Sequence, residues 1–414
     1  MRILHTSDWH LNDKLNRHER QPDLCARMTE IAAILRDESV DAMLIAGDLF
    51  ADRVARLSEL RGALNDLLDA FRGFLDGGGT IVAISGNHDS EELFELLRSA
   101  QNLTTRVALA PGQAAPPGRL YLSAKPAVLT LEGRDGQRVQ VAMQPYPTPS
   151  FYLSGTGDPE VQSAAERNDL LHRRAVDLLA QQVKRCASQP LPSVLLAHAH
   201  VRNSLLSHSL YRIEERDDVV FNPGDLPSFA YTALGHIHRP QTINNCDNVR
   251  YSGSIERMDA AERDEGKGVV LVDIGPVSAG PAREIPLDAT PILDEEISGP
   301  TDLAALQEKY TAAQRERAYL RYLLRCRVQD EAALHRDVRR LFPRWYTSSA
   351  EHTDGKELRA EAQVSSARLR DTAGTARTFV DERLRDHPDR ADVLRRLDGL
   401  LESLREPQPV EVRP

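Results

Sequence analysis

The chain has 414 residues, of which 41% are hydrophobic and 28% charged, a composition typical of a soluble globular protein with two or three domains. Its formal net charge of -10 argues against a surface coated in basic residues for nonspecific DNA binding, although a local basic face or bound cations leave a nucleic-acid partner open. Its four isolated cysteines indicate neither a disulfide framework nor a zinc knuckle, and no apolar run approaches the roughly 20 residues that span a bilayer.

Residues 1–275 alternate short apolar runs with stretches of helical spacing. The runs at 3–4, 42–45, 81–84, 194–197, 231–234 and 269–274 predict strands, and helices are predicted over 22–36, 57–75 and 160–186. Two apolar runs flanking 133–136 predict a β-hairpin. This mixed order predicts an α/β fold, a two-sheet β-sandwich flanked by helices, as the first domain. Because Met1 leads directly into the first strand, we expect no signal peptide, a cytoplasmic location and no membrane association.

The remaining chain predicts three smaller parts. A segment rich in Pro, Gly and Asp at 275–300 predicts a link to a small α/β capping domain over 276–350, with a helix at 303–315, a strand at 319–328, a helix at 331–342 and a short strand at 345–346. A polar linker is expected at 351–373 and a helical tail at 374–414. The tail carries an apolar stripe at helical spacing, which predicts docking on its own capping domain or, as we prefer, on a partner's coiled coil.

Acids and imidazoles follow five of the predicted strands directly. These segments are Ser7-Asp8-Trp9-His10, Gly47-Asp48, Gly86-Asn87-His88-Asp89, His198-Ala199-His200 and Gly235-His236-Ile237-His238. Any one of them alone is a weak signal, but the carboxyl ends of neighbouring strands meet at one edge of a sheet. The set therefore predicts a dinuclear metal site that hydrolyses phosphate esters, built from oxygen and nitrogen ligands that suit Mn, Fe, Co or Zn.

Each residue type suits one task in such a site. Asp48 follows a glycine and is the best candidate for a carboxylate shared by two ions, while Asn87 offers a neutral carbonyl oxygen. His198 is preferred to His200 as a ligand because it comes first after its strand. We predict that His88 stabilises the transition state or donates a proton, oriented by the neighbouring Asp89.

The longer strings around these residues resemble the calcineurin-like metallophosphoesterase superfamily and, within it, the SbcD-type DNA exonucleases. The strings that carry the resemblance are Leu4-His5-Thr6-Ser7-Asp8-Trp9-His10-Leu11, Gly47-Asp48-Leu49-Phe50, Tyr231-Thr232-Ala233-Leu234-Gly235-His236-Ile237-His238-Arg239-Pro240-Gln241, Tyr251-Ser252-Gly253-Ser254-Ile255-Glu256-Arg257 and Glu265-Gly266-Lys267-Gly268-Val269. The resemblance covers residues 1–275 densely and becomes thin beyond them.

The resemblance implies a metallophosphoesterase fold and two manganese ions. One ion would be held by Asp8, His10, Asp48 and His238, the other by Asp48, Asn87, His198 and His236, with His88 acting on the phosphate. It also implies a nuclease subunit with 3'-5' exonuclease activity on double-stranded DNA and endonuclease activity on single strands or hairpins. The implied partners are DNA, an SbcC-type coiled-coil ATPase and a second copy of the chain, for which the helix at 57–75 is a plausible contact.

Two departures from the family pattern concern the nuclease activities. Asn12 stands where many relatives have Gly. Ala51 stands where many have His or Asp, a residue that the resemblance implies helps to position the scissile phosphate, so this second departure leaves the balance of exonuclease and endonuclease activity open. A small-molecule phosphodiesterase or phosphatase on the same core, or a scaffold that has lost its metals, are the alternatives. A further expectation concerns Arg321, Arg325 and Arg327, which fall on one face of a predicted strand and either border the DNA path or pair with nearby acids.

Overall fold

A computed structural model of the chain describes residues 1–51, 57–104, 113–153, 163–206 and 218–354, together with residues 394, 396 and 397. These residues fall into two compact units, one made of 1–295, 310–322 and 341–347 and the other of the described residues in 296–309, 323–340 and from 348 on. None of the described helices is long and apolar enough to cross a membrane.

The first six-stranded sheet has the order β16-β15-β1-β4-β5-β6. Its strands are β1 (Arg2–Thr6), β4 (Ala42–Ile45), β5 (Thr80–Ile84), β6 (Leu120–Ser123), β15 (Gly268–Asp273) and β16 (Arg283–Pro286). Strands β1, β4, β5 and β6 run parallel, whereas β15 pairs with β1 and with β16 in the antiparallel sense. The carboxyl ends of β1, β4 and β5 therefore open on the same edge of the sheet.

The second six-stranded sheet has the order β13-β14-β12-β9-β8-β7. Its strands are β7 (Ala127–Glu132), β8 (Arg138–Gln144), β9 (Ser193–His198), β12 (Tyr231–Gly235), β13 (Gln241–Ile243) and β14 (Cys246–Tyr251). Strands β7 and β8 form the predicted hairpin, and β8, β9, β12 and β14 are parallel. Short strands lie outside both sheets as two pairs, β2 (Lys14–Leu15) with β3 (His18–Glu19) and β10 (His200–Val201) with β11 (Val220–Phe221).

Alternate side chains of the central strands are buried on opposite faces, as the period of two in a strand requires. Ile3 packs in a core cluster with residues of both sheets, whereas its neighbour Leu4 packs in a cluster with residues of the helices. His5 lies between the sheets with Tyr231 (3.0 Å to its hydroxyl) and the carbonyl of Leu234 (3.0 Å), and burial lowers its pKa to about 3. His5 is therefore part of the buried core that joins the two sheets.

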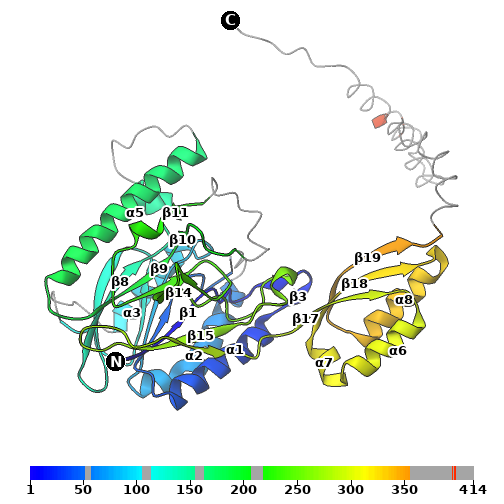
Figure 1. Cartoon of the computed structure of the whole chain (residues 1–414), viewed down its shortest axis with the longest axis horizontal. Coiled ribbons are helices and arrows are strands. Elements are labelled where there is room, and N and C mark those ends of the chain that lie inside the picture. The colour runs from blue at the N-terminus through cyan, green and yellow to red at the C-terminus, as the bar shows by residue number, and fades with distance from the viewer. Residues whose placement is uncertain are drawn as a thin grey trace, which may run out of the picture. The chain divides into compact units, whose positions relative to one another are not determined.

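Helices cover the outer faces of the two sheets (Figure 1). The first sheet packs against α1 (Gln21–Asp37), α2 (Leu57–Asp76) and α3 (Glu91–Thr104), and the second against α5 (Ala164–Ala187). The Ser163 side chain caps α5 by accepting a hydrogen bond from the Glu166 N–H (3.2 Å). The remaining short elements are α4 (Pro149–Tyr152), η3 (Pro223–Asp225) and η4 (Ala260–Glu262). The predicted two-sheet α/β architecture is confirmed.

The last three strands of the described chain form a three-stranded sheet with the order β17-β18-β19. It consists of β17 (Ile292–Ile297), β18 (Tyr319–Cys326) and β19 (Trp345–His352), and the helices in this part of the chain are α6 (Pro300–Lys309), α7 (Ala312–Arg317) and α8 (Val328–Leu341). The predicted helix at 303–315 is wrong in one respect, because it is two helices. The predicted link at 275–300 contains two strands, β16 and β17, and the strand predicted at 345–346 runs to His352.

The three arginines singled out on β18 and just after it pair with acids. Arg321 contacts Asp294, Arg325 contacts Glu296 (3.0 Å) and Glu351 (3.2 Å), and Arg327 contacts Asp330 (2.8 Å). This arrangement supports the alternative of a solvated face balanced by nearby carboxylates. The domain limits given above stay predictions, and the predicted linker and tail lie outside the described residues except for residues 351–354, 394, 396 and 397.

Candidate metal centre

The five predicted segments converge where parallel strands end. Asp8 and His10 follow β1, Asp48 follows β4, Asn87 and His88 follow β5, His198 ends β9, and His236 and His238 follow β12. Four of these residues have the positive φ that is uncommon outside glycine: Asp8 (53°), His10 (47°), Asp48 (51°) and His236 (103°). The backbone therefore turns sharply at the strand ends and directs these side chains inward.

One group of donors is formed by Asp8, His10 and His238. Their ligand atoms lie within 4.8 Å of one another, and all three side chains are nearly buried. The Nε2 atoms of His10 and His238 lie 3.3 Å apart. Both oxygens of Asp8 accept hydrogen bonds from the His236 backbone N–H (3.1 and 3.2 Å), and one also accepts from the Ser7 hydroxyl (2.5 Å).

A second group is formed by Asn87, His198 and His236. The Asn87 Oδ1 atom lies 2.9 Å from His198 Nε2 and 2.9 Å from His236 Nδ1, and these two nitrogens lie 3.3 Å apart. Two donor atoms bound to one ion at about 2.1 Å in tetrahedral geometry lie about 3.4 Å apart, so the spacing of both groups fits a metal ion.

Asp48 lies between the two groups. Its Oδ1 accepts a hydrogen bond from the His88 backbone N–H (2.8 Å), while its Oδ2 lies 3.4 Å from His198 Nε2 and 3.7 Å from His10 Nε2. Burial opposes the charged form of this carboxyl, but the neighbouring His198 and His10 outweigh burial and hold its pKa below the usual range. One oxygen is thus fixed by the backbone and the other points to both groups, as a shared ligand requires.

Glycines allow this close approach of the loops. A Cβ on Gly86 would lie 2.0 Å from Asp48 Oδ1, and one on Gly47 would lie 2.2 Å from His198 Nδ1. Gly47 also has a φ of +90°. The residues that precede the predicted ligands must therefore lack a side chain if the donor atoms are to meet.

Each of three histidines is held through the ring nitrogen that faces away from the donor groups. His198 Nδ1 lies 2.7 Å from the Ala46 carbonyl, His236 Nε2 lies 2.8 Å from Asp218, and His238 Nδ1 lies 2.8 Å from Glu262. A partner at the far nitrogen fixes the tautomer and leaves a lone pair toward the site, which is the usual environment of a metal-bound histidine. The residues present therefore fit two divalent ions.

Asp218 and Glu262 are functional candidates that sequence reasoning missed. Asp218 also contacts His200 Nδ1 (3.0 Å) and accepts a hydrogen bond from the Tyr146 hydroxyl (2.6 Å). His200 therefore lies behind His236 rather than among the donors around Asn87. In the sequence both acids stand in runs of several carboxylates, so no local signal distinguishes them.

His88 is half-buried at the edge of the donor groups. Its ring lies edge-on to that of His10, with centroids 5.0 Å apart. The hydrogen bonds of Asp89 differ from the prediction that this carboxylate orients the imidazole. Its oxygens accept from the backbone N–H groups of Gly86, Leu49 and Phe50 (2.8 to 3.1 Å), so Asp89 fixes the loop that carries His88. Burial and the nearby Asp48 raise the pKa of Asp89 to about 7.

Comparison with known proteins gives relatives for most of the chain. Residues 1–240 match the family described as calcineurin-like phosphoesterase. The chain is 33% identical over 301 residues to the SbcD subunit of nuclease SbcCD from Rhodobacter capsulatus, covering 69% of each protein. It is 29% identical over 296 residues to the corresponding subunit from Bacillus subtilis, covering 70% of each. Among solved structures, a dimetal phosphatase from Danio rerio aligns with a TM-score of 0.36 at 11% identity, covering 68% of this chain and 98% of that one.

Proposed function

This chain belongs to the calcineurin-like phosphoesterase family, and from that membership and its site we propose that it is the manganese-dependent nuclease subunit of a DNA-processing complex. The activities proposed are 3'-5' exonuclease on double-stranded DNA and endonuclease on single strands or hairpins, during DNA end processing and double-strand-break repair. The observation that carries the proposal is Asp48 Oδ2, which faces His198 of one donor group and His10 of the other.

Each of the two donor groups would hold one ion, and Asp48 would be shared by both. Asp8, His10, Asp48 and His238 would hold one, and Asp48, Asn87, His198 and His236 the other. Two divalent ions held by these residues would supply Lewis-acid polarisation of the phosphoryl oxygens and would activate a water. Hydrolysis then adds one water across the bond between phosphorus and the 3'-oxygen.

The contribution of His88 follows from its position. Its backbone N–H is fixed to Asp48 and its loop is fixed by Asp89, so its imidazole is held beside the donor groups. From there it can donate a hydrogen bond or a proton to an oxygen of the phosphate as negative charge grows. A positioned acid of this kind contributes about 10²- to 10⁴-fold to the rate.

The partners proposed are DNA, a coiled-coil ATPase and a second copy of the chain. The relatives in Rhodobacter capsulatus and Bacillus subtilis are each described as one subunit of the nuclease SbcCD, which supports a partner subunit. The apolar stripe of the tail supports docking on a coiled coil, because an amphipathic helix needs an apolar surface to cover it. The helix α2 is proposed as the contact between two copies.

Digestion of end-labelled linear duplex DNA in Mn²⁺ tests this function. We expect the wild type to release short products, His88→Ala to lose about 10²- to 10⁴-fold in rate, and Asp48→Ala to lose activity together with bound manganese. His352→Ala is the matched control, because this histidine pairs with Glu331 outside the site, and it should digest DNA as the wild type does.

Two results would contradict the proposal. A wild-type protein that leaves DNA intact but hydrolyses a small phosphodiester would be the small-molecule phosphoesterase kept open above. A wild-type protein that binds no Mn²⁺ in calorimetry would be the metal-free scaffold.

A further inference from the structure

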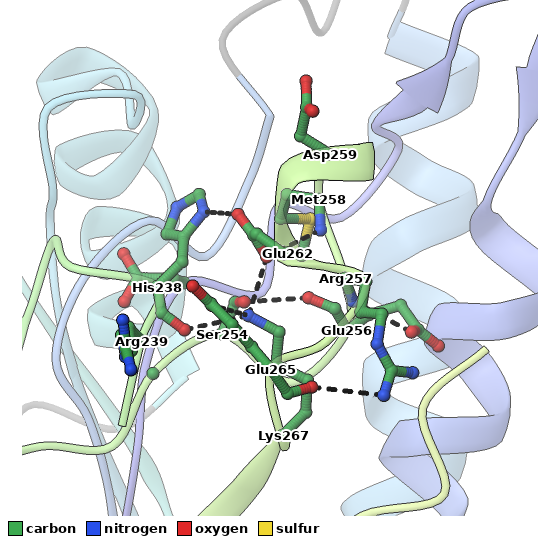
Figure 2. A network of polar contacts seen from close by, with 12 residues as sticks. His238, Arg239, Ser254, Glu256, Arg257, Met258, Asp259, Glu262, Glu265 and Lys267 are labelled. Carbon is green, nitrogen blue, oxygen red and sulfur yellow. Dashed lines mark hydrogen bonds and ion pairs between the residues drawn. The ribbon is translucent and has the colours of Figure 1, made fainter. Parts of the chain in front are cut away.

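A buried ion pair lies beside the metal centre (Figure 2). The Nζ of Lys267 lies 2.7 Å from Oε2 of Glu262, and both side chains are 0% exposed. Burying two charges carries a desolvation penalty that their attraction only partly offsets, so such a pair is weak evidence for a role in stability alone. Its contacts indicate a different role.

Both members of the pair contact the same residue, His238. The carboxylate of Glu262 holds the imidazole through Oε1 and Nδ1 (2.8 Å), while the ammonium of Lys267 donates to the His238 backbone carbonyl (2.9 Å). Figure 2 shows the two side chains reaching His238 from the same stretch of chain, Glu262 from the end of η4 and Lys267 from the position just before β15. The ring and the backbone of this single residue are therefore fixed together.

The two residues are themselves placed by regular structure. Glu262 ends η4, whose first turn is capped by the Asp259 side chain, and its Oε2 also accepts from the Met258 N–H (3.0 Å). Lys267 immediately precedes β15, a central strand of the first sheet. Because both side chains are buried and hydrogen-bonded to the protein itself, the orientation that they give to His238 does not depend on a bound ion.

The consequence falls on one of the two donor groups. With its Nδ1 proton directed to Glu262, His238 turns the Nε2 lone pair toward His10, 3.3 Å away. His236, two residues earlier, belongs to the other group and has a different support, the carboxylate of Asp218 with the Tyr146 hydroxyl and His200 around it. The two histidines of one short motif thus lie in front of unlike carboxylates.

We propose that Glu262 and Lys267 are positioning residues that orient His238 and set the affinity of the His10–His238 metal position independently of the other position. The inference rests on the proposed function, in which His10 and His238 share an ion. A carboxylate behind a metal-bound histidine is worth about 10- to 100-fold in metal affinity. Loss of the Glu262 charge should therefore weaken the binding of one ion and leave the affinity for the other ion unchanged.

Manganese titration of the metal-free protein, followed by calorimetry and by the electron paramagnetic resonance of free Mn²⁺, tests the proposal. For Glu262→Gln we expect one of two dissociation constants to rise about 10- to 100-fold and the other to stay within twofold. The matched control is Glu256→Gln. Glu256 is 0% exposed and lies in the preceding loop, but its carboxylate accepts hydrogen bonds from Thr290 and the Arg257 N–H rather than from a histidine. This control should lower thermal stability without changing either dissociation constant.

The His10→Ala background shows which position responds. His10→Ala removes a donor of the His10–His238 position, so only the dissociation constant of the other position should remain measurable. Adding Glu262→Gln should change that dissociation constant by less than twofold. Asp218→Asn in the same background should still raise that dissociation constant, because Asp218 holds His236 of the other position. In DNA digestion, Glu262→Gln should raise the Mn²⁺ concentration needed for half-maximal rate, with the rate at saturating Mn²⁺ within about threefold of the wild type.

The double variant Glu262→Gln, Lys267→Met provides for the case in which the single variant fails to fold, because it removes both buried charges together. The double variant should show the same loss of manganese affinity at one position only. Unchanged manganese constants in either variant would overturn the proposal, as would equal weakening of both positions. A wild type that binds no Mn²⁺ would refute the proposed function instead, so the two failures are distinguishable.

Discussion

Replacing Gly86 by alanine should separate the loops that form the metal centre. The added Cβ would lie 2.0 Å from Asp48 Oδ1 and 2.5 Å from the Asp48 backbone nitrogen, whereas ordinary contact begins at 3.4 Å. The contact with the backbone nitrogen falls short of ordinary contact by about 0.9 Å, and a backbone atom cannot rotate away, so the loop after β5 must move by about that distance relative to the loop after β4. Gly86 does not have a positive φ, so the effect is steric rather than conformational.

The movement would carry Asn87 and His88 away from Asp48 and break the 2.8 Å hydrogen bond between the His88 N–H and Asp48 Oδ1. Misplacement by about 1 Å costs on the order of 10²-fold in rate, and overpacking costs about 1 to 3 kcal/mol of stability. We therefore expect Gly86→Ala to lower kcat in DNA digestion by about 10²-fold and to lower Tm.

Gly62→Ala is the matched control for this prediction. Gly62 lies inside α2, and a Cβ added there would meet nothing within 4 Å, so alanine should stabilise the helix by about 0.5 to 1 kcal/mol and leave kcat unchanged. A Gly86→Ala enzyme with wild-type kcat, and a crystal structure in which His88 N and Asp48 Oδ1 remain 2.8 Å apart, would refute the reasoning.

Three further predictions concern other parts of the chain. Burial gives His5 a pKa of about 3 in the folded protein, so below pH 6.5 the unfolded chain takes up a proton that the folded chain does not. The free energy of unfolding should therefore fall by about 1.4 kcal/mol for each pH unit of acidification from this residue alone. In urea titrations from pH 7 to 5, the free energy of unfolding should depend less steeply on pH for His5→Gln than for the wild type. Leu68 on α2 is 43% exposed, and Leu68→Glu should shift a dimer to monomer in sedimentation without loss of helicity. Arg325 already pairs with two acids, so Arg325→Ala should leave the DNA dissociation constant at low salt within twofold, and a tenfold loss would restore the DNA-path hypothesis.

The fold could be predicted wherever the chain carries strong apolar periodicity. The central strands and the helices α1, α2 and α5 are continuous apolar runs or stripes, and their limits agree with the prediction to within a few residues. Strand β16, in contrast, reads Arg-Glu-Ile-Pro and exists because it pairs along β15 at the edge of the sheet. Edge strands need little apolar content, so their sequences resemble loops.

The break between α6 and α7 does have a local signal. Thr311 begins α7 with a capping box, in which its side chain accepts from the Gln314 N–H and the Gln314 side chain accepts from the Thr311 N–H. The spacing Thr-x-x-Gln within a polar stretch is the sequence signature of such a start. Helical composition on both sides conceals the boundary.

The candidate ligands could be predicted from the sequence, but the carboxylates that support them could not, because these carboxylates lie far along the chain from the histidines that they contact. The ligands stand in motifs two to four residues long, directly after strands, where position alone gives direction. Glu262 reaches His238 from 24 residues away and Asp218 reaches His236 from 18 residues away, each out of a run that offers several acids. Which acid is chosen depends on the pairing of β15 with β1 and of β10 with β11, which no local pattern contains.

Backbone strain at the strand ends connects these observations. Asp8, His10, Asp48 and His236 all adopt positive φ, at a cost on the order of 1 kcal/mol or more each. Hydrogen bonds between the loops offset that cost: the Asp8 N–H donates to the Gly47 carbonyl and the His10 N–H to the Asp48 carbonyl (3.0 Å each). The same bonds lie in the backbone and need no ion. The loops that carry Asp8, His10 and Asp48 are therefore held in place beside the paired strands β1 and β4, and an ion entering the site meets three ligands whose ordering was completed during folding.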